Sequence, residues 1–358
     1  MSYKCEIIAD SLSPQGNRLT TYVITYPRIV HAEMCRHRML SRNTASSRAI
    51  PFAKMIKDVQ ENPFIPIAWQ FKHKGMQGSE YVNPEEHYGE IEARVDSWLE
   101  ARDKAVEMAN DLDFLDTTKQ LCNRLLEPFV WTTEIITGTE WANFFELRCP
   151  QYVVSGYPDG CNPEALEPFE ATFRSRKDAI GWLPELENFT EIDWLECNES
   201  QAEIHIQKIA EMMWDARNQS TPKSLKPGEW HIPFGDNISN EKLREAVAPE
   251  SLKEGFVRTK DYMQKKIEGA IKIATARCAR ISYLNFEGKD DYRADIKLHD
   301  RLMEMKHWSP FEHCARVMSE KEISFHIRTG LARQQAWKEY GWCRNFRGFI
   351  QYRHMVES

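Results

Sequence analysis

Arg36-His37-Arg38-Met39-Leu40-Ser41-Arg42-Asn43-Thr44-Ala45-Ser46-Ser47-Arg48 is the stretch around which the rest of this chain can be interpreted. It holds four arginines, one histidine, one asparagine and three serines within thirteen residues. Guanidinium groups and hydroxyls are the groups with which proteins hold phosphates and the edges of planar rings. A solvated basic turn is the alternative interpretation of a charged run. The mixed polar pattern favours a ligand, because so many neighbouring cations repel one another unless an anion lies among them.

The bulk composition limits the classes of protein to which the chain can belong. Its 358 residues, 42% of them hydrophobic and 28% charged, suffice for one large domain or two. The net charge of −7 argues against a general nucleic-acid-binding protein, which is usually basic. No apolar run approaches the roughly 20 residues of a membrane span, and the N-terminus lacks the apolar core of a signal peptide. We therefore expect neither a membrane nor a nucleic-acid partner.

Nine cysteines are scattered along the chain without regular spacing. An odd number without a framework of repeated spacings favours reduced thiols and a cytoplasmic protein. No Cys-x-x-Cys pair occurs, so the sequence predicts no metal site.

The pattern Arg36-His37-Arg38-x-x-Ser41-x-Asn43-x-x-Ser46-x-Arg48 resembles the signature of flavin-dependent thymidylate synthases, which methylate deoxyuridylate without a cysteine nucleophile. Further segments resemble the same family: 124–128, 141–148, 276–283 and 307–313. The last two precede the arginine motif in the family but follow it here, so the chain resembles a circularly permuted member. Permutation is reasonable because domain termini often lie close together.

The resemblance implies roles for particular residues. Arg148 and Ser46 are the implied catalytic residues. The nucleotide substrate, a pyrimidine deoxynucleoside monophosphate, would be bound by Glu33, Arg36, Ser46, Ser47, Arg48, Arg124 and Arg148. The flavin would be bound by Arg36, His37, Arg38, Asn43, Thr44, Thr137, Thr139, Asn143, Ser282, His307 and Ser309. Taken singly, Arg148 is also a cation favoured at a helix C-terminus, and His37 and His307 are also ordinary hydrogen-bonded histidines.

The implied cofactors are FAD, methylenetetrahydrofolate and NADPH, with the flavin held between subunits of a homo-oligomer, a tetramer in the family. The sequence departs from the family pattern at Thr137, Thr139, Tyr152 and Glu33. These departures leave open a hydroxymethyl transfer, or methylation of another pyrimidine deoxynucleotide. A nucleic-acid-binding protein that places the arginines on phosphates is the alternative from a different class.

The pattern of elements predicts an α+β fold, with an antiparallel sheet and flanking helices, as in the synthase family. Residues 5–8 and 20–30 are predicted strands, rich in β-branched and aromatic side chains. Helices are predicted for residues 52–59, 85–112, 119–126, 139–148, 204–216, 252–280 and 295–306. A long loop is predicted around the glycines and prolines of 150–163.

Three parts of the chain are expected. Residues 1–150 and 252–358 would form the two parts of the synthase core, and 151–251 an insertion or accessory subdomain. The arginine-rich C-terminal segment either completes the ligand site or lies on an acidic partner surface, and the sequence leaves both possibilities open.

Overall fold

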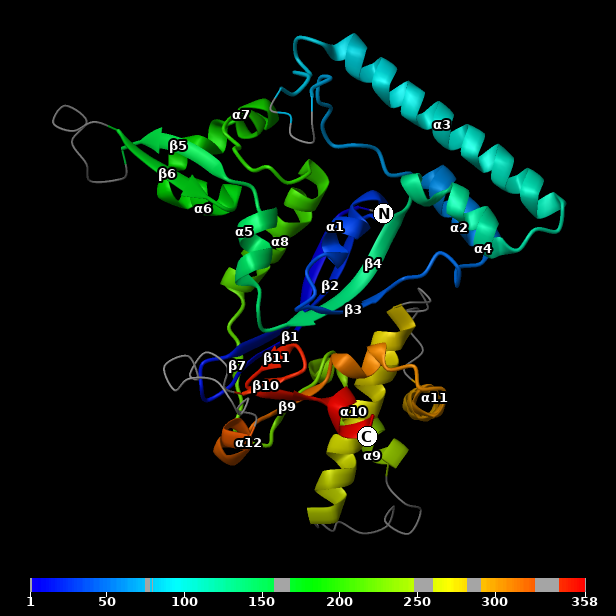
Figure 1. Cartoon of the computed structure of the whole chain (residues 1–358), viewed down its shortest axis with the longest axis vertical. Coiled ribbons are helices and arrows are strands. Elements are labelled where there is room, and N and C mark those ends of the chain that lie inside the picture. The colour runs from blue at the N-terminus through cyan, green and yellow to red at the C-terminus, as the bar shows by residue number, and fades with distance from the viewer. Residues whose placement is uncertain are drawn as a thin grey trace.

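The structure is a computed structural model that describes residues 2–74, 78, 80–157, 168–247, 260–281, 291–325 and 341–357. A five-stranded sheet with the order β3-β4-β2-β1-β7 lies at its centre (Figure 1). Its strands are β1 (Lys4–Leu12), β2 (Arg18–Pro27), β3 (Ser41–Thr44), β4 (Trp131–Gly138) and β7 (Lys223–Ser224). All neighbours are antiparallel except β1 and β7. The predicted α+β class with a mainly antiparallel sheet is therefore confirmed.

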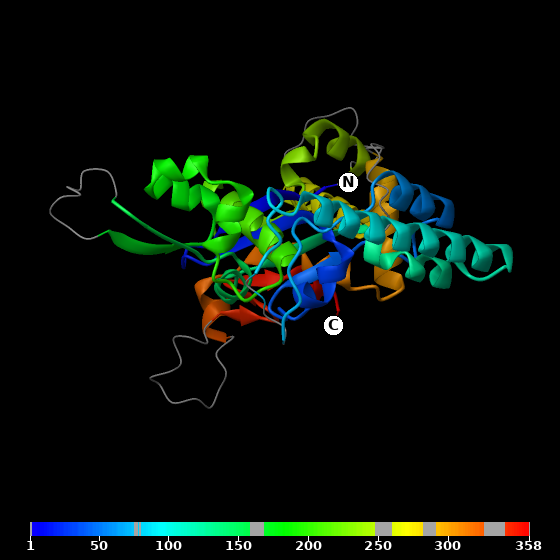
Figure 2. The ribbon, with the colours of Figure 1, turned by 90° about the horizontal axis from the view of Figure 1, so that it is seen from above.

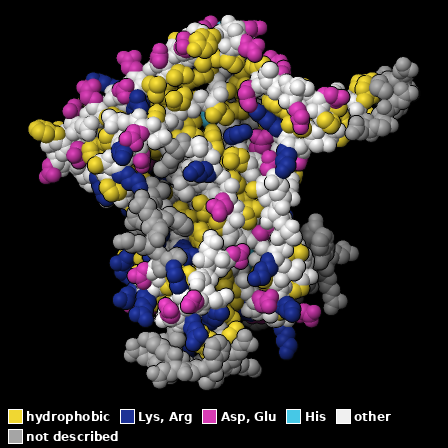
Figure 3. All heavy atoms as spheres, turned by 180° about the vertical axis from the view of Figure 1, so that it is seen from behind, with side chains coloured by type: hydrophobic (Ala, Val, Ile, Leu, Met, Phe, Trp, Pro, Cys, Tyr) yellow, Lys and Arg dark blue, Asp and Glu magenta, His cyan; other side chains and the backbone are white. Residues whose placement is uncertain are grey.

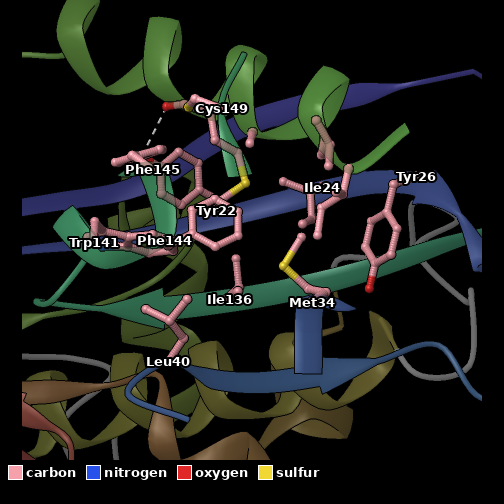
Figure 4. Close-up of a cluster of buried hydrophobic side chains, with 14 of the residues drawn as sticks. Tyr22, Ile24, Tyr26, Met34, Leu40, Ile136, Trp141, Phe144, Phe145 and Cys149 are labelled. Atoms are coloured by element: carbon pink, nitrogen blue, oxygen red, sulfur yellow. Dashed lines mark hydrogen bonds between the residues drawn. The ribbon is translucent and has the colours of Figure 1, made fainter. Parts of the chain in front are cut away.

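Successive side chains of β2 and β4 point to opposite faces of the sheet, and both faces are buried. Tyr22, Ile24 and Ile136 point into the larger core cluster, which α5 (Ala142–Arg148) and α8 (Ile204–Gln219) cover (Figure 4). Val23 and Ile135, one residue out of phase, point into a second cluster with the end of α10 (Lys260–Ile281). Two buried faces explain why these strands are apolar on both sides.

Part of the arginine motif is a strand. It follows the short helix α1 (His31–Cys35), and its middle residues form β3, which pairs with β4 at the edge of the sheet. The prediction also missed β4 itself, although its sequence Trp-Thr-Thr-Glu-Ile-Ile-Thr-Gly is rich in β-branched residues. The predicted strand 20–30 ends at Pro27, after which the chain turns into a 3-10 helix, η1 (Arg28–Val30).

The predicted helices are found with shifted ends wherever the structure describes them. Besides α5, α8 and α10, they are α2 (Phe52–Glu61), α3 (Tyr88–Phe114), α4 (Lys119–Leu125) and α11 (Tyr292–Glu304). Residues 252–259 of the predicted helix 252–280 lie outside the described residues.

The C-terminal part of the chain packs on the sheet face that carries Ile135. A three-stranded sheet with the order β12-β9-β8 is formed by β8 (Trp230–His231), β9 (Ala315–Val317) and β12 (Phe349–Gln351). The 3-10 helix η6 (Ser309–Glu312) lies against β3 and α10. Short elements complete this part: η4 (Gly235–Asn237), α9 (Asn240–Val247), α12 (Glu320–Phe325), β10 (Trp342–Cys343), β11 (Phe346–Arg347) and α13 (Tyr352–Val356).

Two projections leave the central body on opposite sides (Figure 2). One holds α3, packed with α2 and α4 on a separate apolar cluster. The other has its own core and is built from β5 (Tyr152–Gly156), β6 (Phe169–Phe173), α6 (Arg176–Trp182), η3 (Pro184–Asn188) and α7 (Glu191–Glu196). The strand β5 stands where a loop was predicted.

The division of the chain into three parts stays a prediction. Residues of the segment 151–251 contribute to the central body as well as to the projection, because α8 packs on β1 and β2, β7 pairs with β1, and β8 pairs with β9. Among the described residues, no helix combines the length and the apolar character that crossing a membrane requires.

Because the core cluster between the sheet and α8 is closely packed, truncating one of its side chains should strongly destabilise the protein. Met213 on α8 is 0% exposed, and its truncation in Met213→Ala should lower the free energy of unfolding by about 2–5 kcal/mol. Met305, 67% exposed, is the matched control, and Met305→Ala should change the free energy of unfolding by less than about 0.5 kcal/mol. Urea unfolding followed by circular dichroism measures both, and equal effects would contradict the packing described.

Candidate functional site

A hydrogen bond joins the arginine motif to the end of α5. Arg148 Nε donates to His37 Nε2 at 3.0 Å, across a separation of 111 residues. Phe144 and Phe145 anchor α5 in the core, and the His37 ring meets Phe144 edge-on with centroids 5.0 Å apart. Because Nε2 accepts a hydrogen bond here, His37 is the neutral tautomer with its proton on Nδ1. Burial, Arg148 and Arg42 lower the pKa of His37 to about 4.

Arg148 lies among partly compensating charges. Burial lowers the pKa of its guanidinium, Arg36 lowers it further, and Glu33 raises it. Glu33 thus faces a cation at this site. Its Oε2 is buried without a hydrogen-bond partner among the described residues. A buried acceptor of this kind is costly unless a ligand or water donates to it.

Three other arginines of the motif point outward. Arg36, Arg38 and Arg48 are exposed, and among the residues that the structure describes none forms an ion pair with them. Arg42 differs, because its Nη2 donates to the carbonyl of His37 and its Nε lies 4.0 Å from Glu134. The motif therefore presents one compensated cation to the sheet and three uncompensated cations to the surroundings.

Glu134 is a buried carboxylate that the sequence analysis did not single out. It lies on β4 opposite β3 and accepts hydrogen bonds from Tyr26 OH at 2.8 Å and Thr44 Oγ1 at 2.7 Å. Burial raises the pKa of Glu134 above its ordinary value, and Arg42 offsets only part of this increase. An acidic residue in an otherwise apolar, β-branched strand was the signal available in the sequence. The hydroxyl of Thr44, a predicted flavin ligand, is thus already bonded within the chain.

The Ser-Pro-Phe-Glu-His turn contacts the motif directly. Ser309 Oγ donates to Asn43 Oδ1 at 3.3 Å, and Asn43 Nδ2 donates to the Cys278 carbonyl at 2.7 Å. Ser309 is 266 residues from Asn43 in the sequence. Two of the segments singled out for their resemblance therefore meet β3.

The C-terminal segment also reaches the motif. Asn345 Nδ2 donates to Ser41 Oγ at 2.9 Å, and Gln351 Nε2 donates to the same oxygen at 3.2 Å. Arg353 pairs with Glu312 and Glu357 of its own chain, at 2.6 Å in each case. Arg328 and Arg333 of the arginine-rich segment lie outside the described residues. In the described part, its amides rather than its cations touch the motif.

A chain of buried polar groups runs behind the motif. Thr137 Oγ1 lies 2.8 Å from Thr21 Oγ1 and 2.8 Å from His313 Nδ1. Thr21 Oγ1 lies 2.8 Å from His231 Nε2, whose Nδ1 lies 2.8 Å from Ser11 Oγ. Burial lowers the pKa of both histidines to about 3, so both are neutral. Thr137, another predicted flavin ligand, is engaged on both sides by the protein.

A separate cluster gathers at the far end of β3. Glu127 Oε1 accepts from Ser47 Oγ at 2.7 Å and from Arg124 Nη1 at 3.3 Å, and Arg28 Nη2 lies 3.9 Å away. The cavity beside Arg28 and Ser47 has a volume of only about 40 Å³. The structure thus joins Ser47 to Arg124, and His37 to Arg148, as two distinct groups.

Among the remaining predicted site residues, one forms a hydrogen bond with another part of the chain. Thr139 Oγ1 accepts a hydrogen bond from the Arg347 backbone N–H at 3.2 Å. Asn143 and His307 are exposed, and Ser46 is half-buried. Ser282 lies outside the described residues.

Comparison with known proteins gives a partial structural overlap. Two solved structures of a UMP/dUMP methylase, PolB, from Streptomyces cacaoi, one bound with 5-Br UMP and one with 5-Br dUMP, superimpose with a TM-score of 0.37 each. They are 16% and 14% identical in sequence, and the overlap covers 61% of this chain and 89% and 90% of theirs. At this TM-score the overlap assigns neither fold nor function. No protein-family model and no curated protein matches the sequence.

The contact between Arg148 and His37 predicts how the pKa of His37 changes when Arg148 is replaced. Replacing Arg148 with methionine removes a cation that disfavours the imidazolium, so the pKa of His37 should rise from about 4 towards 6.5. Histidine resonances followed by NMR against pH measure this shift. Arg174→Met is the control, because Arg174 pairs with Glu146 and not with His37. An unchanged pKa of His37 in Arg148→Met would contradict the contact.

Proposed function

We propose that this protein transfers a one-carbon unit to C5 of the uracil ring of a pyrimidine deoxynucleoside monophosphate. The reaction proposed is methylation of dUMP to dTMP by a flavin-dependent thymidylate synthase, with methylenetetrahydrofolate as donor and NADPH as reductant. One observation carries the proposal: Arg148, on a helix far along the chain, donates to the histidine of a motif with three exposed, uncompensated arginines. Such an arrangement suits a planar, anionic ligand.

Arg148 is the proposed catalytic residue, and His37 its positioning residue. With Nε bound to His37, both terminal nitrogens of Arg148 have no partner among the described residues. They are available to the negative charge that develops at N3 and O4 when the C5–C6 bond of a uracil ring is polarised. A preoriented, partly buried cation stabilises such charge more than a solvated one. Neutral His37 holds the guanidinium without adding a repelling charge.

The residues that would bind the nucleotide phosphate are Arg48 and Arg124, with Ser46 offering a hydroxyl. Arg48 is exposed and uncompensated, whereas Arg124 contacts Glu127. That contact is an exposed one and is worth at most about 1 kcal/mol, so a phosphate dianion can replace it. Arg36 takes part in the same proposed site, because its charge already acts on Arg148.

FAD fits this chain in part. Arg36 and Arg38 are free to hold its diphosphate, and Asn143 and His307 are exposed and open to contact. Asn43, Thr44 and Thr137 are bonded inside the chain, so we assign them the task of holding the motif in place. The flavin, when bound, supplies the hydride that completes the methyl group. Exposure of the arginines in a single chain supports a flavin held between subunits of a homo-oligomer.

Glu33 admits a second candidate substrate. Its buried Oε2 lacks a donor, and a ligand that brings an N–H or O–H to it would relieve that cost. An exocyclic amine or an additional sugar hydroxyl would serve, as would the N3–H of the uracil ring of dUMP. Another pyrimidine nucleotide is the second candidate, with methyl or hydroxymethyl transfer.

Replacement of Arg148 tests the proposed role. Arg148→Ala should lower kcat with dUMP by about 10²–10³-fold, because one donor to the developing charge is lost, while bound flavin still colours the protein yellow. Arg174→Ala should retain full turnover. Unchanged turnover in Arg148→Ala would remove Arg148 from the mechanism. A colourless wild-type protein whose polynucleotide binding falls steeply with salt would instead favour the nucleic-acid-binding alternative.

The transferred group and the substrate are tested together by mass spectrometry. With isotope-labelled methylenetetrahydrofolate we expect dUMP to gain a methyl group, and reactions with UMP and dCMP run in parallel measure the choice of nucleotide. A product carrying one additional oxygen identifies hydroxymethylation. Replacement of Glu33 in Glu33→Gln should shift the preference towards dUMP if Glu33 receives a donor from another substrate.

A further inference from the structure

A second cavity lies away from the arginine motif, between the two projections. It has a volume of about 230 Å³, and one wall comes from residues 66–95 while the other comes from β5, α7 and α8. Hydrophobic side chains gather in this upper part of the molecule when it is seen from behind (Figure 3). For comparison, a dry apolar cavity of about 150 Å³ suffices to bind benzene. The space therefore accommodates a ligand of one or two rings.

The walls of this cavity are suited to a flat ring. Pro66, Trp69 and Val95 contribute to one side, and Ile192 and Leu195 of α7 to the other. Apolar walls with a few convergent polar groups are the usual construction of a small-molecule site. None of these wall residues belongs to the site proposed for the nucleotide.

The polar groups of the cavity come from β5 and α8. Glu211, 5% exposed, uses Oε1 to accept from the Arg176 backbone N–H at 2.8 Å. Its Oε2 lies 3.8 Å from Lys208 Nζ, beyond hydrogen-bond distance. The Tyr152 hydroxyl accepts from Arg176 Nε at 3.3 Å, which leaves its own proton to donate. The cavity thus offers one carboxylate oxygen as acceptor and two donors, Lys208 and Tyr152.

The charges of the cavity balance. Arg176 is held by both oxygens of Glu191, at 2.6 Å and 2.7 Å, and is not available to a ligand. Lys208 and Glu211 offset each other. A strongly charged ligand such as a phosphate would find no uncompensated cation here, in contrast to the arginine motif. The pocket suits a neutral ligand.

We propose that this cavity binds a neutral, planar heterocycle through a lactam edge, in which a ring N–H lies beside a C=O. The N–H donates to Glu211 Oε2, and the carbonyl accepts from Lys208 or Tyr152. The rings lie between the apolar walls. A pyrimidine base and a pteridine both carry such an edge, and the volume admits either.

Binding of free bases to the full chain tests the proposal. Lumazine, a two-ring lactam, and uracil, a one-ring lactam, are the probes, and calorimetry measures their affinity. Their N-methylated forms, 1,3-dimethyllumazine and 1,3-dimethyluracil, lack the ring N–H of the lactam edge and should bind at least tenfold more weakly. Binding of either parent base supports the site and identifies the ring size. Equal affinity for the parent and methylated forms, or no binding of either parent, would overturn it.

Variants separate this cavity from the nucleotide site. Glu211→Gln keeps an acceptor for the Arg176 N–H but loses the carboxylate, and should weaken binding of the parent base at least tenfold. Glu187→Gln, at an exposed position outside the cavity, should leave binding unchanged. Val95→Trp should fill the space and abolish binding without touching the polar groups. Thermal melting shows that each variant is folded.

The nucleotide site provides the remaining control. Saturating dUMP and the Arg148→Ala variant should both leave binding of the base unchanged, so the result does not depend on turnover. Displacement of the base by dUMP would show that the base occupies the nucleotide site, and would overturn the proposal while leaving the proposed function intact.

Discussion

The hydrogen bond from Arg148 to His37 is the constraint on which the candidate site depends. It requires a neutral imidazole, and burial together with two neighbouring arginines keeps His37 neutral. It also requires that α5 end at one place, which the burial of Phe144 and Phe145 against the sheet and α8 secures. A guanidinium at the end of a helix is ordinarily a mobile surface group. Here its Nε is fixed, and its terminal nitrogens are oriented together.

The residues of the arginine motif divide into two groups. Arg42, Asn43 and Thr44 point inward, where Glu134 and the Cys278 carbonyl hold them. Arg36, Arg38 and Arg48 remain exposed and uncompensated. The edge strand thus has exposed cations on either side of it in the sequence.

The two cavities described differ mainly in volume. Near Ser47 and Arg28 the space is small, and its lining holds one cation, Arg28, and one carboxylate, Asp58. Between the projections the space is larger, apolar and neutral in sum. Pro150, two residues after Arg148, lines this second cavity. The end of α5 therefore adjoins both regions of the molecule.

The sequence by itself determined the α+β class and most helices to within a few residues, because hydrophobic periodicity and residue type are local properties. The segments that meet the motif were indicated only by their resemblance to a known family. Only the tertiary structure decided that the middle of the motif is an edge strand, that Glu134 is its buried anchor, and that Thr44 and Thr137 are bonded inside the protein. These outcomes depend on which strand lies beside β3. The pairing joins Ser41–Thr44 to residues 134–137, some ninety residues away, and no local pattern encodes such a partner.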